Sequence, residues 1–310
     1  MRTLFFLLSL FLICCSTVNR KDDTLVQNDT TQINSLIVTL KQNDDSLGTP
    51  QIGDWLANHK EEAQTFNEYM NSKPVSANEI QNVIYLQPIG KFDSLQTRMI
   101  NYSREYLEIF FGLKTVIQTP ISDNIIPDSA RRIGGSEQEQ LLAPYILNEI
   151  LAKNKPKDAV CIMAITEKDL YPEFSWNFVF GLSSLWKRVG VTSVFRFSDW
   201  QVTDIEYQQF LDRMIKISSH EIGHMFSIKH CVNAQCLMNG SNSMSETDGK
   251  PNRLCSLCNG KLCWNLKLDP LERAKKMANF FKKHRLELDC EKALADIKIL
   301  EQNKNQLINN

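Results

Sequence analysis

Apolar residues follow two different periods along the chain. The run Ala159–Ile165 is almost continuously apolar, which predicts a strand buried on both faces of a sheet. Asn82–Pro88 has the composition of a strand and starts the predicted domain. Three further segments are predicted to be strands: Leu113–Ile121, Asn177–Phe180 and Val189–Phe197.

Between these strands, apolar residues recur at the spacing of one helix face. This pattern predicts helices over Leu95–Phe111, Gln138–Lys153, Thr203–Phe226 and Asp269–His284. The tail from about Leu286 onward is helical and polar, and its pattern indicates no role. Strands that alternate with helices predict an α/β fold with one main sheet.

The first residues have the pattern of an export signal. One arginine precedes about a dozen apolar residues, a run too short to span a bilayer easily but typical of a secretory signal. Leu12 to Cys15 resembles a lipoprotein box, with Cys15 as the lipidated residue. A plain secretory signal and an uncleaved hydrophobic anchor are the alternatives. We expect an exported protein held at a membrane through Cys15, facing the periplasm or the cell surface.

The 33 residues that follow are polar and predict mainly a linker over 16–48, with a short helix around Ile33–Leu40. The chain has 310 residues, of which 43% are apolar, so it can form one large domain or two small ones. Its net charge of −1 gives no indication of a nucleic-acid partner.

The strongest chemical signal lies at the end of the long predicted helix. His220, Glu221 and His224 form H-E-x-x-H, and with His230 they bring three of the five histidines into residues 220–230. Residues four apart share one helix face, so His220 and His224 can bind one metal ion. Glu221 lies beside them, where it can take a proton from a water at that metal. His230 reaches the same ion only if the chain turns back soon after His224.

A cysteine-rich segment follows directly, with C-x4-C and C-x2-C spacings. Four thiolates in two close pairs can complete a tetrahedral zinc shell, which leaves no open position and indicates a structural site. Two disulfides are the alternative if the chain is exported. The four ligands are Cys231, Cys236, Cys255 and Cys258.

The other cysteines carry weaker signals. Cys161 falls in an apolar run and is expected in the core. Cys263 and Cys290 have no partner pattern, and a disulfide between them stays open.

The pattern HExxHxxxxxHCx4CxM followed by CxxC resembles the archaemetzincins, a family of zinc metallopeptidases. Further stretches at 53–66, 155–185 and 188–197 are similar to this family, so the resemblance covers roughly residues 50 to 285. It implies a metzincin-like zinc peptidase domain with a mixed β-sheet, a long active-site helix and a cysteine-rich structural zinc loop. It also implies two zinc ions per chain, one catalytic and one structural.

The resemblance also assigns supporting roles. Met238 matches the methionine turn that forms an apolar floor beneath the catalytic zinc. Ser227 stands where metzincins have the glycine of the turn, and a left-handed backbone at a non-glycine residue costs about 1–2 kcal/mol. A substrate peptide is implied to lie along an edge strand, and we expect Val194–Phe197 to be that edge.

These observations divide the chain into a signal over 1–15, a polar linker over 16–48, an archaemetzincin-like domain over 49–285 and a polar helical tail over 286–310. The favoured function is hydrolysis of peptide bonds by a zinc-activated water with Glu221 as general base. The substrate is then a peptide or protein. A catalytically silent, zinc-stabilised peptide-binding lipoprotein and a hydrolase for a non-peptide amide are the alternatives.

Overall fold

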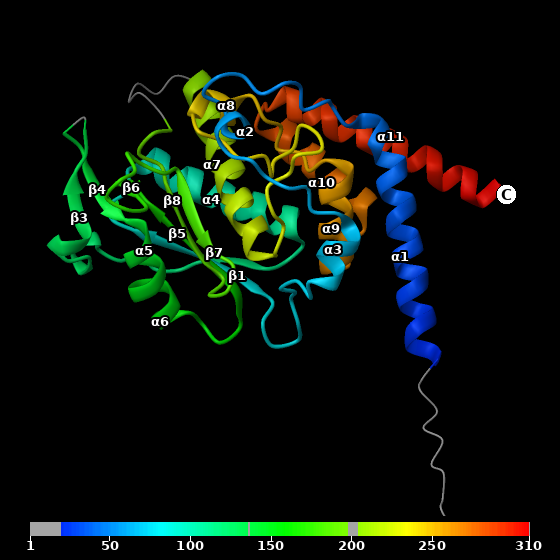
Figure 1. Cartoon of the computed structure of the whole chain (residues 1–310), viewed down its shortest axis with the longest axis horizontal. Coiled ribbons are helices and arrows are strands. Elements are labelled where there is room, and N and C mark those ends of the chain that lie inside the picture. The colour runs from blue at the N-terminus through cyan, green and yellow to red at the C-terminus, as the bar shows by residue number, and fades with distance from the viewer. Residues whose placement is uncertain (1–19, 136, 198–203, 310) are drawn as a thin grey trace, which may run out of the picture.

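The computed structural model of the protein describes residues 20–135, 137–197 and 204–309 (Figure 1). Cys15 and the signal-like segment lie outside these residues. The strands are β1 (Val83–Ile89), β2 (Thr115–Ile117), β3 (Arg131–Ile133), β4 (Glu139–Leu142), β5 (Ala159–Thr166), β6 (Asp169–Tyr171), β7 (Gly181–Ser184) and β8 (Val189–Ser193). The α-helices are α1 (Arg20–Leu40), α2 (Trp55–Asn58), α3 (Phe66–Asn71), α4 (Ser94–Phe111), α5 (Ala143–Tyr145), α6 (Ala152–Asn154), α7 (Asp204–Met225), α8 (Met244–Asp248), α9 (Ser256–Leu266), α10 (Pro270–Lys283) and α11 (Glu287–Asn309).

The main sheet is mixed and has the strand order β2-β1-β5-β8-β7. Its first four strands are parallel, and β7 runs antiparallel to β8 at the edge. All residues of β5 are buried, as the continuous apolar run predicts. The α/β fold and the mixed sheet are therefore confirmed.

Helices cover both faces of this sheet (Figure 1). On one face α4 and α7 pack together and against the strands, and Met163 and Ile165 of β5 join their hydrophobic cluster. On the other face Ile162 and Ala164 pack against the segment from α5 to α6. Because successive side chains of a strand point to opposite faces, a strand covered on both sides needs no polar positions.

Three helix predictions agree closely with the structure, and one is partly wrong. Helices α4, α7 and α10 match their predicted ranges to within one residue. The predicted helix Gln138–Lys153 instead begins with β4, which pairs with β3 and β6 in a second sheet. Helical structure starts only at Ala143, so that Pro144 falls in the first turn, where its missing N–H costs nothing.

The last two strands are shifted from their predicted positions. Val179 makes only an isolated bridge, and β7 begins after it at Gly181. Strand β8 ends at Ser193 and lies between β5 and β7, so the expected edge at Val194–Phe197 is wrong. Val194 and Phe197 are buried, and the edge strand on this side is β7.

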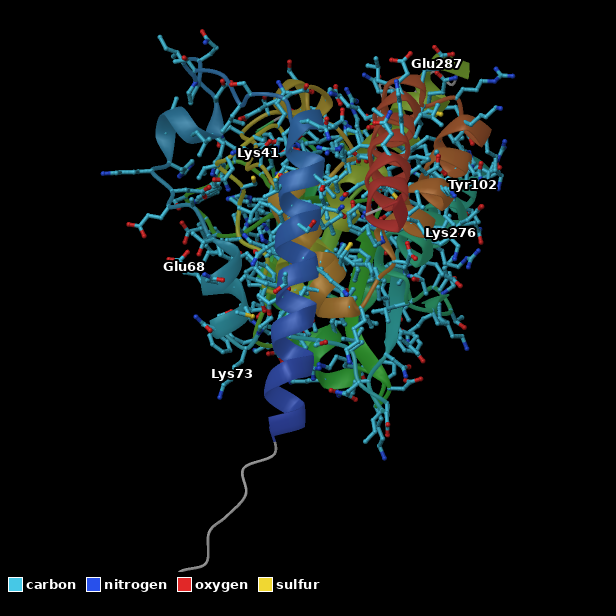
Figure 2. All side chains as sticks on the ribbon, turned by 90° about the vertical axis from the view of Figure 1, so that its right-hand side faces the viewer. Lys41, Glu68, Lys73, Tyr102, Lys276 and Glu287 are labelled. Atoms are coloured by element: carbon cyan, nitrogen blue, oxygen red, sulfur yellow. The ribbon has the colours of Figure 1, made fainter. Side chains whose placement is uncertain are left out.

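The segment predicted mainly as a linker contains a longer helix than expected. The short helix around Ile33–Leu40 is the end of α1, which spans 21 residues and packs beside α9 and α11 (Figure 2). Leu36 and Leu40 are buried against Cys263 and Leu300. Apolar residues at helical spacing in this otherwise polar segment are the signal for the packing. Cys263 and Cys290 are free thiols, so no disulfide joins them.

The two last helices form one packed pair. Helix α10 starts at its cap Asp269, as predicted, and α11 packs along it. Arg253 joins this end of the domain to the N-terminal segment through ion pairs with Asp296 and Asp44, at 2.8 and 2.7 Å. Among the described residues, no helix is long and apolar enough to cross a bilayer.

Candidate active site and metal centres

Helix α7 and the loop after it bring His220, His224 and His230 together, and we call these three residues the histidine site. The Nε2 atoms of His220 and His224 are 3.0 Å apart. The ring of His230 lies 5.3 Å from that of His220 and 4.9 Å from that of His224, measured between centroids. One ligand nitrogen from each residue falls within 4.8 Å of the other two.

The hydrogen bonds of the rings fit a metal ligand set. The Nδ1 atom of His220 lies 2.9 Å from the carbonyl of Leu237, and that of His224 lies 2.7 Å from the carbonyl of Ile228. Since a carbonyl only accepts, both Nδ1 atoms carry the hydrogen, and in the neutral rings the two Nε2 lone pairs face each other. A shared cation removes that repulsion, and two nitrogens bound to one zinc lie about 3.3 Å apart.

Burial also keeps these rings neutral. It lowers the pKa of His224 to about 4 and that of His220 well below its usual value. The charge of His230 further lowers the pKa of His224, and the charges of His224 and His230 further lower that of His220. A neutral imidazole is the form that binds a metal.

The turn that returns the chain to the metal site is made at Ser227. Its φ of 70° is left-handed, and its N–H donates to the carbonyl of His224 at 2.8 Å. The Ser227 Oγ accepts from the N–H of Val75 at 3.0 Å. Serine therefore makes the turn that glycine makes in the metzincin pattern, and its side chain holds the N-terminal segment.

Met238 lies directly beneath the helix turn that carries the two histidines. It is fully buried, and a Cβ on Gly223 would come within 2.7 Å of its Sδ. Gly223 stands between His220 and His224 in the sequence, so the absence of a side chain there lets Met238 approach the backbone under the site.

The carboxylate of Glu221 is held on the side of β7. Its Oε2 accepts a hydrogen bond of 2.6 Å from Ser183, and a Cβ on Gly181 would lie 3.0 Å from Oε1. Burial raises the pKa of Glu221 to about 7. A carboxyl with that pKa can both take up and release a proton near neutral pH.

The histidine site opens into a cavity of about 840 Å³. Phe178, Phe180 and Trp176 contribute to one wall together with β7, and residues 237–250 contribute to another. Such a cavity is large enough for a peptide segment. Glu221 and the three histidines line this same cavity, which makes it the candidate active site.

Sequence reasoning missed the residue that holds His230. The Oε1 of Glu61 lies 2.6 Å from the Nδ1 of His230 and also accepts a 3.0 Å bond from the indole of Trp55. Trp55 packs edge-on against His230, with ring centroids 5.2 Å apart. A carboxylate on the far nitrogen of a histidine ligand fixes its tautomer and orientation. Glu61 lies in the stretch at 53–66 on which the family resemblance partly rests, so that resemblance could have pointed to Glu61 as a site residue.

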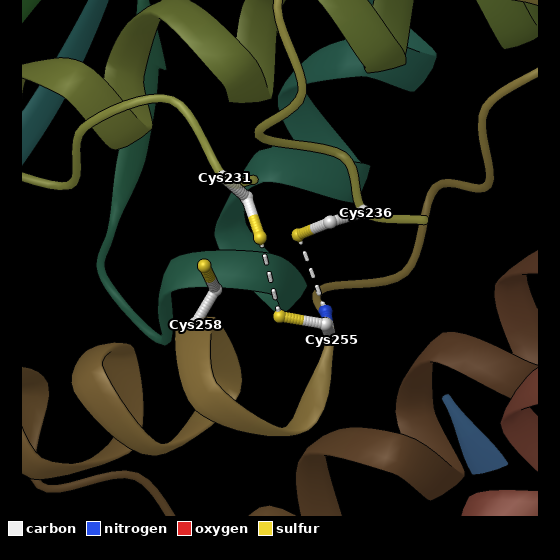
Figure 3. Close-up of side chains that lie close together, drawn as sticks. All are labelled: Cys231, Cys236, Cys255 and Cys258. Atoms are coloured by element: carbon white, nitrogen blue, oxygen red, sulfur yellow. Dashed lines mark hydrogen bonds between the residues drawn. The ribbon is translucent and has the colours of Figure 1, made fainter. Parts of the chain in front are cut away.

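The four cysteines Cys231, Cys236, Cys255 and Cys258 form a second cluster, the cysteine site (Figure 3). Their Sγ atoms lie within 4.8 Å of one another, and those of Cys231 and Cys255 are 3.6 Å apart. This is close to the 3.8 Å or so between two sulfurs on one zinc and far from the ~2.05 Å of a disulfide. All seven cysteines in the described part of the chain are free thiols.

The surroundings of the cysteine site fit a bound cation. The backbone N–H groups of Cys255 and Met238 donate to Cys236 Sγ at 3.2 and 3.4 Å. Burial raises the pKa of the Cys236 thiol well above its usual value. Four buried thiolates therefore need a metal to offset their charge, and these donors match what thiolate ligands accept.

Two short backbone links join the two sites. Leu237, which accepts from His220, stands between Cys236 and Met238. The N–H of Cys231 donates to the carbonyl of Met238 at 2.8 Å. The geometry of the histidine site therefore depends on the loop that the cysteine site closes.

Comparisons with known proteins agree with this geometry. The profile of peptidase family M54 matches residues 145–263. The chain is 33% identical to archaemetzincin-2 of Rattus norvegicus over 258 residues, which cover 73% of this chain and 72% of that protein. It is 29% identical to archaemetzincin of Pyrococcus furiosus over 186 residues, 59% of this chain and 93% of that protein. The crystal structure of archaemetzincin from Methanopyrus kandleri is similar with a TM-score of 0.50 and 25% identity, and the match covers 62% of this chain and 98% of that one. The chain belongs to the archaemetzincin family of zinc metallopeptidases.

Proposed function

We propose that this chain hydrolyses peptide bonds at the histidine site, with Glu221 as general base. The observation that carries the proposal is the placement of a buried carboxyl, held by Ser183, on the same cavity as three converging histidines. When bound, zinc supplies a Lewis acid that polarises the carbonyl and makes a water acidic near neutral pH.

The residues of the chain then perform the proton transfers. Ser183 occupies Oε2 of Glu221, which leaves Oε1 to accept the proton of the attacking water. The protonated Glu221 passes that proton to the leaving amine, first base and then acid. A pKa of about 7 suits both steps.

Strand β7 is the proposed binding edge for the substrate. It is an edge strand, and Gly181, Leu182 and Ser183 line the cavity beside Glu221. An extended peptide can pair with the free edge by strand addition, which aligns its carbonyls with the site.

We also propose two zinc ions per chain, the second at the cysteine site with a structural role. A silent peptide-binding lipoprotein is the second candidate function, and a non-peptide amide is an alternative substrate. The buried Glu221 favours catalysis, because burying an ionisable carboxyl costs stability that binding alone does not require.

The test compares the full-length protein with Glu221→Ala. We expect about two zinc ions per chain in both, cleavage of a mixed peptide library by the wild type, and a loss of about 10²–10⁴-fold in the variant. Peptide binding without turnover by a wild type that holds two zinc ions supports the silent binding protein instead.

A second proposal concerns location: we propose export and lipid attachment at Cys15. Helix α1 begins five residues later, and its first turns extend away from the domain (Figure 1). The later turns of α1 pack on the domain, so only the first turns can separate the domain from a bilayer. Cys15→Ser should move the protein from the membrane fraction to the soluble fraction, while Cys14→Ser should not. Equal partition of both variants contradicts the proposal.

A further inference from the structure

The cavity carries two lysines on the wall next to the histidine site. Lys216 lies on α7 one helical turn before His220, and Lys250 follows α8. Both line the cavity, and Lys216 is only 3% exposed. A step of four residues along a helix is about 6 Å, so Lys216 stands close to His220 along α7. The charge of Lys250 also acts on His220, so both lysines lie near the histidine site.

The carboxylates near these lysines do not line the cavity. Lys216 donates to Asp212 at 2.8 Å, and the charge of Glu246 acts on Lys250. Neither acidic residue belongs to the cavity wall. The lining carboxylates are Glu221, which Ser183 holds, and Glu173 on the loop before β7.

Lys250 itself has donors to spare. Its Nζ donates to the backbone carbonyl of Asn239, and among the described residues it forms no ion pair with a carboxylate. An ammonium group has three donors, so two are available to a ligand. Burial lowers the pKa of Lys250 to about 7, and the charge of Glu246 offsets only part of this effect.

A third polar group on the same cavity is also unsatisfied. The Oγ of Ser241 is buried and has no hydrogen-bond partner among the described residues. Ser241 lines the cavity with Lys250 and Lys216. A hydroxyl that makes no hydrogen bond within the protein is available to a ligand in the cavity.

We propose that Lys250, with Lys216 and Ser241, forms a subsite that binds a carboxylate of the substrate next to the cleaved bond. This inference rests on the proposed peptidase function. An ammonium and a hydroxyl offer hydrogen bonds to both oxygens of a carboxylate. The carboxylate can come from an Asp or Glu side chain or from the C-terminus of the substrate.

Binding without turnover provides the test. Full-length, zinc-loaded Glu221→Ala is titrated with peptides that differ only in Glu or Gln at one position, each with a free or an amidated C-terminus. We expect one carboxylate source to bind about 10- to 100-fold more tightly than its neutral counterpart. The Glu/Gln pair and the free/amide pair identify which source it is.

A second variant assigns the preference to Lys250. In the Glu221→Ala background, Lys250→Met should remove the preference for the carboxylate, and the exposed Lys157→Met should leave it unchanged. Equal affinities for charged and neutral peptides overturn the proposal even if Lys250→Met fails to fold, because that comparison needs no lysine variant. A preference that survives Lys250→Met in a folded, zinc-loaded protein also overturns it.

The same experiment separates this inference from the catalytic proposal. Carboxylate preference that depends on Lys250, in a chain whose wild type cleaves nothing, supports the subsite and contradicts catalysis. The opposite result is cleavage by the wild type with no preference between Glu and Gln or between a free and an amidated C-terminus. It supports catalysis and contradicts the subsite.

Discussion

The histidine site and the cysteine site are neighbours in sequence, since His230 and Cys231 are adjacent, yet their surroundings differ. The four cysteines are at most 3% exposed and belong to the main hydrophobic core. The three histidines are half-buried and line a cavity of about 840 Å³. One backbone segment therefore supplies a closed centre and an open one.

The difference shows how each site obtains its geometry. The histidines on α7 are held by carbonyls of Leu237 and Ile228, and packing of the helix against the sheet fixes their direction. The cysteines come from a loop and from the start of α9, so metal binding itself has to join those parts. A metal that closes a loop contributes to folding, whereas a metal on a rigid helix contributes mainly chemistry.

The largest expected effect comes from removing one ligand of the cysteine site. Cys258→Ser should remove the structural zinc, lower the free energy of unfolding by several kcal/mol and weaken the histidine site through Leu237. Zinc content and the thermal midpoint measure both effects. Cys263→Ser is the matched control, since Cys263 is a buried free thiol on the same helix outside the cluster. Two zinc ions in Cys258→Ser would contradict the structural role.

Removing a ligand from the open site should have a more local effect. His230→Ala should reduce the zinc content from about two ions to about one and abolish peptide cleavage, with little change in thermal midpoint, because packing already positions α7. Loss of both ions would show that the two sites depend on each other more strongly than we propose.

A smaller change tests the carboxylate behind His230. Glu61→Gln keeps the shape of the side chain but weakens its hold on the ring, so zinc affinity at the histidine site should fall by about 10- to 100-fold. Competition with a chelator measures the affinity, and the cysteine site should retain its ion. Glu62→Gln, at the exposed neighbouring position, should change nothing. Equal affinities for the two variants would sink the idea.

The smallest effect is expected at the turn. Ser227→Gly should relieve about 1–2 kcal/mol of left-handed strain and lose the hydrogen bond from Val75, so its net stability change should be close to zero. Ser227→Ala keeps the strain and loses the bond, and it should be less stable by about 1–2 kcal/mol in urea unfolding. Equal stability of the two variants would show that the left-handed backbone at Ser227 is not strained.

Local patterns predicted much of the fold. The continuous apolar run gave β5, and helical periodicity gave α4 and α7 within one or two residues, because each element is buried along a face that its own sequence encodes. Strand β4 was missed because its four residues also fit a helical spacing, and pairing with β3 and β6 decided its structure.

The sequence by itself determined which groups gather at the two centres, because the spacing of four on a helix and the close cysteine pairs are local properties. The tertiary structure decided what surrounds them. Glu61 reaches His230 across 169 residues, and Ser183 reaches Glu221 across 38. The choice of β7 as the edge strand and the lysines on the cavity wall also depend on how distant segments pack. No local pattern encodes such contacts, since they exist only once the chain has folded.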